Sequence, residues 1–208
     1  MRVLEVKRLK KIYSWMSSHY KRLIIRVFDS FLPLGGELDL KGYVVLRGYI
    51  PEGINLEEKD ELEKFLLSDR YILDIFQSYI GSKTFEYSEL WEAPSSSSSG
   101  VWHHDSVGHR VKVFVSLSDA SDNLGTQIIP NTHKMCYQDY NHTRLKVSKK
   151  NEAEAQLITM NRRDVLIFDT NAIHRGVYGK RTRIVHQFEL CTGLKGKMLP
   201  GHIGVRSD

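Results

Sequence analysis

The sequence predicts a single, mainly β domain with helices toward its N-terminus, folded as an antiparallel sandwich, barrel or jelly roll. Short strand-forming runs follow one another after residue 84, whereas helical periodicity is found in the residues before it. The length of 208 residues fits one domain, which at this size buries about 70% of the surface of its unfolded chain. A hydrophobic fraction of 41% and a charged fraction of 26% exclude a wholly disordered protein.

The first part of the chain is expected to contain three helices and one strand. The helices are expected over residues 3–32, 55–67 and 68–80, and the strand over residues 42–48. Pro33 ends the first apolar pattern. Asn55 followed by Glu58 resembles a capping box, and Ser68 is expected to open the next helix.

The remaining chain is expected to be a succession of strands separated by turn-forming stretches. The strand-forming runs cover residues 84–92, 111–117, 126–129, 155–160, 164–168 and 182–190. Such a succession without helices between the runs favours antiparallel sheets. A serine-rich tract, Ser95–Gly100, lies just before the most polar motif and is expected to form a lid or part of one, with an inert surface linker as the alternative.

The basic character of the chain is concentrated at its start. Residues 1–26 hold eight lysines and arginines against Glu5 alone, which gives this segment a net charge of +7 within a chain total of +5. We therefore expect residues 1–40 to be a basic helical arm packed on the core. The alternative is that residues 1–30 contact an anionic membrane surface or substrate. Because the body is not basic, nucleic acid is not the expected partner.

The compartment is expected to be the reducing cytoplasm. Cys136 and Cys191, the two cysteines, form no CxxC pair or disulfide framework. The N-terminal residues lack the apolar segment of a signal peptide. No apolar run approaches the roughly 18–20 residues that span a bilayer.

One constellation of residues carries chemistry. His103 and Asp105 are two residues apart, so on a strand their side chains point to the same face. His174 supplies a second imidazole from a distant part of the chain. Two histidines and one carboxylate on one face of an octahedron make the facial triad of non-haem Fe(II) oxygenases. Arg183 follows in a β-rich run, where a fixed guanidinium can bind a carboxylate.

These motifs, in this order, resemble those of the Fe(II)/2-oxoglutarate-dependent dioxygenases of the phytanoyl-CoA dioxygenase-like family. The resemblance covers roughly residues 41–190 and includes Trp102-His103-His104-Asp105, His174 and Arg183. It also includes Pro130-Asn131-Thr132-His133, where the family usually has Pro-Gly-Ser-His. Asn131 replaces that glycine, which is acceptable because asparagine enters the left-handed region readily.

The resemblance implies a double-stranded β-helix (jelly roll, cupin-like) over residues 41–208. It implies that His103, Asp105 and His174 bind Fe(II), and that 2-oxoglutarate and O2 are consumed. Hydroxylation of a small-molecule or carrier-linked metabolite would release succinate and CO2. A carboxylate ligand favours hydroxylation, because related halogenases have a small residue in its place.

The resemblance further implies that Arg183 binds the 5-carboxylate of 2-oxoglutarate. It also suggests that Thr126 donates a hydrogen bond to a cosubstrate carboxylate, and an ordinary strand threonine without such a role is equally open. The short spacer after His174 leaves Arg181 as an alternative anchor, since both arginines point the same way on a strand. Lys112 alternates with three valines, so we expect it to face a polar cavity and to contribute to cofactor binding.

The neighbouring histidines and tryptophans have more ordinary interpretations. His133 is expected to be structural, whereas His104 has structural and substrate-side roles equally open to it. Trp91 and Trp102 are expected to pack in the core.

Two rival functions stay open at this point. One is a cupin-like protein with bound zinc and no oxygenase activity, because histidine and aspartate ligands alone do not select iron. The other is a nucleic-acid-directed 2-oxoglutarate oxygenase, which the pI of 9.1 suggests. The sequence does not identify the substrate, for which an anionic or carrier-linked small molecule is the expected class.

Overall fold

The computed structural model describes residues 36–80, 85–93, 100–105, 110–119, 124–134, 147–177 and 183–191. Two antiparallel sheets form the body, a five-stranded sheet in the order β1-β6-β3-β8-β2 and a three-stranded sheet in the order β5-β4-β7. The strands are β1 (Tyr43–Leu46), β2 (Phe85–Ala93), β3 (Arg110–Ser116), β4 (Gly125–Ile128), β5 (Gln156–Ile158), β6 (Val165–Asp169), β7 (His174–Val177) and β8 (Arg183–Cys191). Neighbouring strands are often distant in the sequence, as expected of a jelly roll.

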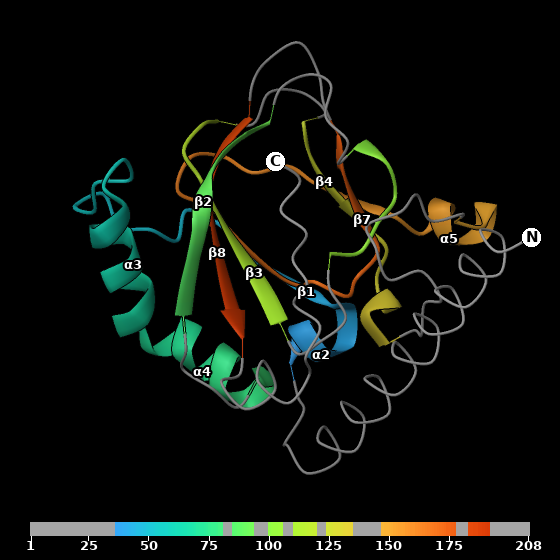
Figure 1. Cartoon of the computed structure of the whole chain (residues 1–208), viewed down its shortest axis with the longest axis horizontal. Coiled ribbons are helices and arrows are strands. Elements are labelled where there is room, and N and C mark those ends of the chain that lie inside the picture. The colour runs from blue at the N-terminus through green and yellow to red at the C-terminus, as the bar shows by residue number, and fades with distance from the viewer. Residues whose placement is uncertain are drawn as a thin grey trace, which may run out of the picture.

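The central strand β3 of the larger sheet buries side chains on both of its faces. In β3, alternate valines (Val111, Val113 and Val115) pack in a cluster that includes Leu62 of α3 (Lys59–Ser68) and Phe76 of α4 (Arg70–Ile80). The intervening Phe114 belongs instead to a cluster shared with β4 and β5 of the smaller sheet. In Figure 1, α3 and α4 lie at the left, the larger sheet at the centre, and β4 and β7 at the right. Strand alternation therefore defines an inner face, between the two sheets, and a helix-covered outer face.

Both helices begin later than the sequence predicts. Asn55 Oδ1 accepts the backbone N–H of Glu57 at 3.1 Å, which closes a turn, and α3 starts only at Lys59. Ser68 is the last residue of α3. The carboxylate of Asp69 accepts the backbone N–H of Ile72 at 2.9 Å and so caps the start of α4. The capping predictions at Asn55 and Ser68 are therefore wrong: α3 begins after Glu58 without a side-chain cap, and Asp69 instead of Ser68 caps α4.

Three short elements were not expected from the sequence: α2 (Glu37–Lys41), α5 (Lys149–Ala153) and β7. Each has five residues or fewer, too few for a periodic pattern to emerge. α2 places Leu38 in the core beside β1. The predicted helix over residues 3–32, the serines 95–99 and Arg181 lie outside the described residues. None of the described helices is long and apolar enough to cross a membrane.

Candidate metal centre

Two separate segments bring the ligand candidates together. His103 forms an isolated antiparallel bridge with His174, the first residue of β7. Their backbones exchange two hydrogen bonds, His103 N–H to His174 O at 3.0 Å and His174 N–H to His103 O at 2.8 Å. The backbone N–H of Asp105 donates to Thr170 O at 2.9 Å. The segment that carries His103 and Asp105 is thus fixed against the loop and strand that carry His174.

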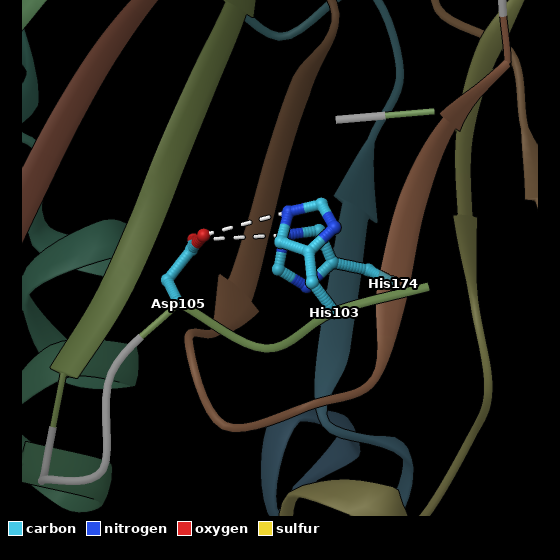
Figure 2. A group of neighbouring side chains, drawn as sticks. All are labelled: His103, Asp105 and His174. Carbon is cyan, nitrogen blue, oxygen red and sulfur yellow. Dashed lines mark ion pairs between the residues drawn. The ribbon is translucent and has the colours of Figure 1, made fainter. Parts of the chain in front are cut away.

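The three side chains converge. Asp105 Oδ1 lies 3.6 Å from His103 Nε2, and Asp105 Oδ2 lies 3.5 Å from His174 Nε2. One ligand atom from each residue can be chosen so that all three lie within 4.8 Å of one another. Figure 2 shows the carboxylate facing both imidazole rings, whose centroids are 4.4 Å apart. The structure brings together the three residues that the sequence singled out.

Backbone carbonyls fix the tautomer of both rings. His103 Nδ1 lies 2.7 Å from Val101 O, and His174 Nδ1 lies 2.8 Å from Ala172 O. A carbonyl oxygen only accepts, so each Nδ1 carries the hydrogen. Nε2 is then the ring nitrogen that can offer a lone pair to a metal, and in both rings it lies beside the Asp105 carboxylate. Three electron-pair donors facing one another suit a cation, and the set of two imidazoles and one carboxylate fits a divalent transition metal.

The charge states match metal binding. Burial raises the pKa of Asp105, but the Lys112 ammonium and then the two histidines outweigh burial and hold this pKa well below its usual range. Burial lowers the pKa of His174 to about 3, against the opposing effect of Asp105. At neutral pH the centre therefore holds an ionised carboxylate and a neutral His174, which are the protonation states that metal ligation requires.

Lys112 lies on the inner face at the end that holds His103, Asp105 and His174, called the metal end below. Its Nζ is 2.7 Å from Asp105 Oδ2, and its side chain is only 15% exposed. The sequence placed Lys112 on the face opposite the valines of β3, which agrees with this position.

Arg183 and Thr126 meet across the two sheets. Arg183, the first residue of β8, donates from Nη1 to Oγ1 of Thr126 in β4 at 2.7 Å. Both residues are buried, Arg183 at 7% and Thr126 at 2% exposure. A buried guanidinium beside a hydroxyl can bind a carboxylate through several donors.

Aromatic rings connect the two ends of the inner face. Phe168 lies 5.0 Å from the ring of His174 and 5.1 Å from that of Phe114. The guanidinium of Arg183 is 5.7 Å from the centre of the Phe114 ring. One apolar path thus runs from the three ligand candidates to Arg183.

The Pro-x-Thr-His element is structural. Asn131 has a φ of 64°, the left-handed conformation that its place in the motif suggested. Thr132 Oγ1 accepts the backbone N–H of Ile173 at 2.8 Å, next to His174. The ring of His133 lies 3.0 Å from Asp39 O and closely approaches Gly42. His104 is buried, and Trp102 packs with Ile129 and Ile173.

Sequence reasoning missed Asp169. Its buried carboxylate accepts the hydroxyl of Tyr79 at 2.7 Å and the backbone N–H of Asn171 at 2.6 Å. It thereby shapes the turn that leads to His174. The one available signal was Asp169 followed two residues later by Asn171, a spacing that suits an Asx turn.

Fold and donor set together define a jelly-roll protein with a centre of two histidines and one carboxylate. Its fold is similar to that of EctD from S. alaskensis, solved with 2-oxoglutarate and 5-hydroxyectoine, at 16% identity and a TM-score of 0.50 over 77% of each chain. It is also similar to apo HygX from Streptomyces hygroscopicus, at 15% identity and a TM-score of 0.50 over 75% of this chain and 84% of that one.

HygX has also been solved with nickel and 2-oxoglutarate bound, and that structure covers 75% of this chain and 85% of its own, at 15% identity and a TM-score of 0.49. The likeness to EctD and to apo HygX confirms the jelly-roll fold that the sequence predicts. Neither a protein-family model nor a curated protein matches the chain.

Proposed function

We propose that this protein is an Fe(II)- and 2-oxoglutarate-dependent oxygenase that hydroxylates a small molecule, with release of succinate and CO2. One observation carries the proposal: a cluster of metal-ligand type and a buried arginine–threonine pair occupy the two ends of one inner face. A protein that binds only a metal ion would need the ligand cluster but not the arginine–threonine pair. A 2-oxo dicarboxylic acid uses both, because one end chelates the metal while the other carries a second carboxylate.

The residues present fit iron. His103, Asp105 and His174 would hold it, with Nε2 as the donor of each ring. Three protein ligands leave the remaining octahedral positions for the cosubstrate and O2. When bound, iron with O2 and 2-oxoglutarate supplies the oxidising chemistry, and the protein positions it.

Arg183 would bind the 5-carboxylate of 2-oxoglutarate, and Thr126 would orient the guanidinium. Burial strengthens this charge-assisted interaction, since little water competes for either partner. Phe114 and Phe168 would pack against the carbon chain of 2-oxoglutarate between its two carboxylates. Arg181, the alternative anchor, lies outside the described residues.

Lys112 would act at the metal end. Its ammonium keeps Asp105 ionised and holds one of its oxygens at 2.7 Å. Any contact of Lys112 with the cosubstrate would therefore be with the 1-carboxylate beside the metal, and not with the distal carboxylate at Arg183.

The proposed partner is a small-molecule substrate, anionic or carrier-linked, handled in the cytoplasm. The 5-hydroxyectoine in the EctD structure supports the small-molecule class. A zinc-bound cupin without oxygenase activity is less well supported, because it gives no role to the buried Arg183–Thr126 pair. A nucleic-acid substrate is not favoured either, since the basic excess lies in residues 1–26.

Anaerobic titration tests the proposal. Fe(II) and 2-oxoglutarate added to metal-free protein should produce a weak visible charge-transfer band, and admission of O2 should yield succinate. Arg183→Ala should require far more 2-oxoglutarate to reach the same band. A fully iron-loaded wild-type protein that shows neither band nor succinate would exclude the function.

A further inference from the structure

We propose that Trp102, Arg175 and Glu152 are positioning residues that together hold His103 and His174 in register. These three residues are called the tryptophan clamp below. The inference rests on the proposed function only in taking His103 and His174 to be metal ligands.

The two histidine-bearing segments have little backbone pairing with each other, although β7, which carries His174, also pairs with β4. His103 and His174 are joined by one isolated bridge, with hydrogen bonds of 3.0 and 2.8 Å. By contrast, β3 and β8 share a continuous register of seven residue pairs. A further backbone tie between these segments is the hydrogen bond from Asp105 N–H to Thr170 O at 2.9 Å. So few backbone contacts fix the separation of two segments but resist twisting poorly, so we infer that side chains supply further restraint.

The clamp residues lie immediately beside the histidines in sequence. Trp102 precedes His103 and Arg175 follows His174, so alternation directs both away from the inner face. The guanidinium carbon of Arg175 is 4.2 Å from the centre of a Trp102 ring, which is cation–π geometry. Each segment therefore touches its partner on both faces, through the imidazoles on one side and the clamp on the other.

Glu152 joins the two other members. Its Oε1 accepts the indole N–H of Trp102 at 3.2 Å and lies 3.4 Å from Nη1 of Arg175. Arg175 is held from a further side by Gln127 of β4, whose Oε1 accepts its Nε–H at 2.7 Å. One carboxylate oxygen thus binds both segments at once, while Gln127 ties Arg175 to the smaller sheet.

The short helix α5 presents Glu152 to the clamp. Ser148 caps the helix by accepting the backbone N–H of Asn151 at 3.2 Å. The helix buries none of its own residues, but Val147 and Ala155 on either side pack against Trp102, Ile129 and Ile173. Glu152 adds a hydrogen bond to Trp102 and an ion pair to Arg175 to this apolar packing.

Loosening the clamp should turn one imidazole relative to the other and weaken metal binding. Metal affinity is sensitive to residues that orient ligands, with losses of about 10–100-fold on mutation. Trp102→Ala, which removes the centre of the clamp, should lie in that range. Glu152→Ala should cost about 3–10-fold, since its contacts are partly exposed. Trp102→Phe should retain most of the affinity, because the ring face is kept.

The test measures Mn(II) dissociation constants by calorimetry without 2-oxoglutarate, for wild type, the three variants and Glu154→Gln. Glu154 ends the same helix without a side chain in the clamp, so its variant should bind like wild type. Hydrogen exchange of the His103 and His174 amides in metal-free protein is the second measurement. Trp102→Ala and Glu152→Ala should accelerate it about 10-fold.

Hydrogen exchange at the two histidine amides distinguishes failure of the clamp from failure of the proposed function. If wild-type protein binds no metal, yet exchange at the two histidines rises in both variants, the function fails and the clamp stands. Unchanged exchange and unchanged Mn(II) affinity in folded Trp102→Ala would overturn the clamp. So would a lower melting temperature without any change at the histidines, because the role would then be general packing.

Discussion

The two ends of the inner face are fixed by different parts of the fold. At the Arg183 end, β8 pairs with β2 and β3, while Thr126 sits in β4 between β5 and β7. At the metal end, His103 and Asp105 lie outside the named strands and are fixed by one bridge and one loop contact. The first end is set by sheet ladders on both sides, whereas the segment with His103 and Asp105 is held by three backbone hydrogen bonds and by side chains. Substitutions at the metal end should therefore change function with little loss of stability.

The metal end should give the largest functional loss. His103→Ala, Asp105→Ala and His174→Ala should each abolish succinate formation, because two ligands no longer hold the metal in the same geometry. Circular dichroism should show the fold intact in all three variants, since none of the three residues is a member of the main hydrophobic clusters. Succinate production retained by all three would overturn the ligand assignment.

The Arg183 end should give the next largest effect, on the cosubstrate alone. Arg183→Ala leaves the buried 5-carboxylate of 2-oxoglutarate unpaired, which costs about 2–5 kcal/mol of binding free energy. The KM for 2-oxoglutarate should therefore rise about 30-fold or more. Thr126→Val should cost about 1 kcal/mol, the usual contribution of one hydrogen bond. Arg181→Ala should change the KM far less, and the reverse order would make Arg181 the anchor.

Acid should destabilise the metal-free protein through the metal end. The pKa of His174 falls from 6.5 to about 3 on folding, so the unfolded chain binds the proton more readily. Stability is therefore unaffected above pH 6.5 and is lost as the pH falls toward 3, by about 2 kcal/mol at pH 5. His174→Gln removes this group, and its urea-unfolding free energy should fall less between pH 7 and pH 5. If the unfolding free energies of wild type and His174→Gln fall equally between pH 7 and pH 5, His174 does not cause the acid destabilisation.

A substitution in α4 should have a smaller effect on the metal end. Tyr79→Phe removes the hydroxyl that donates to Asp169 and should lower the free energy of unfolding by about 1–2 kcal/mol. Because Asp169 shapes the turn before His174, metal affinity should fall a few-fold as well. Tyr71→Phe, at an exposed position in the same helix, is the matched control. Equal metal affinity in both variants would show that the contact between Tyr79 and Asp169 does not influence the metal ligands.

Much of the fold followed from local pattern. The valines of β3 alternate in the sequence, and in the structure they face the helices while Lys112 and Phe114 face inward. Strand positions were predictable because the side-chain period of two is a local property. The helix starts at Asn55 and Ser68 were mispredicted, because several neighbouring polar residues fit a cap equally well in sequence. In the structure Asn55 closes a turn before α3, and Asp69 binds the free N–H of Ile72 in α4.

The sequence by itself singled out the residues that we propose carry the chemistry, in their order along the chain: His103, Asp105, His174 and Arg183. It also determined the β-rich body, since hydrophobic alternation is read from neighbours a few residues apart. Only the tertiary structure decided that Lys112 meets Asp105, that Arg183 meets Thr126 across two sheets, and that Glu152 bridges Trp102 and Arg175. These contacts join residues up to 57 positions apart, as between Thr126 and Arg183, and no local period relates such positions. They exist because sheet pairing and the packing of two sheets bring distant strand positions within hydrogen-bonding distance.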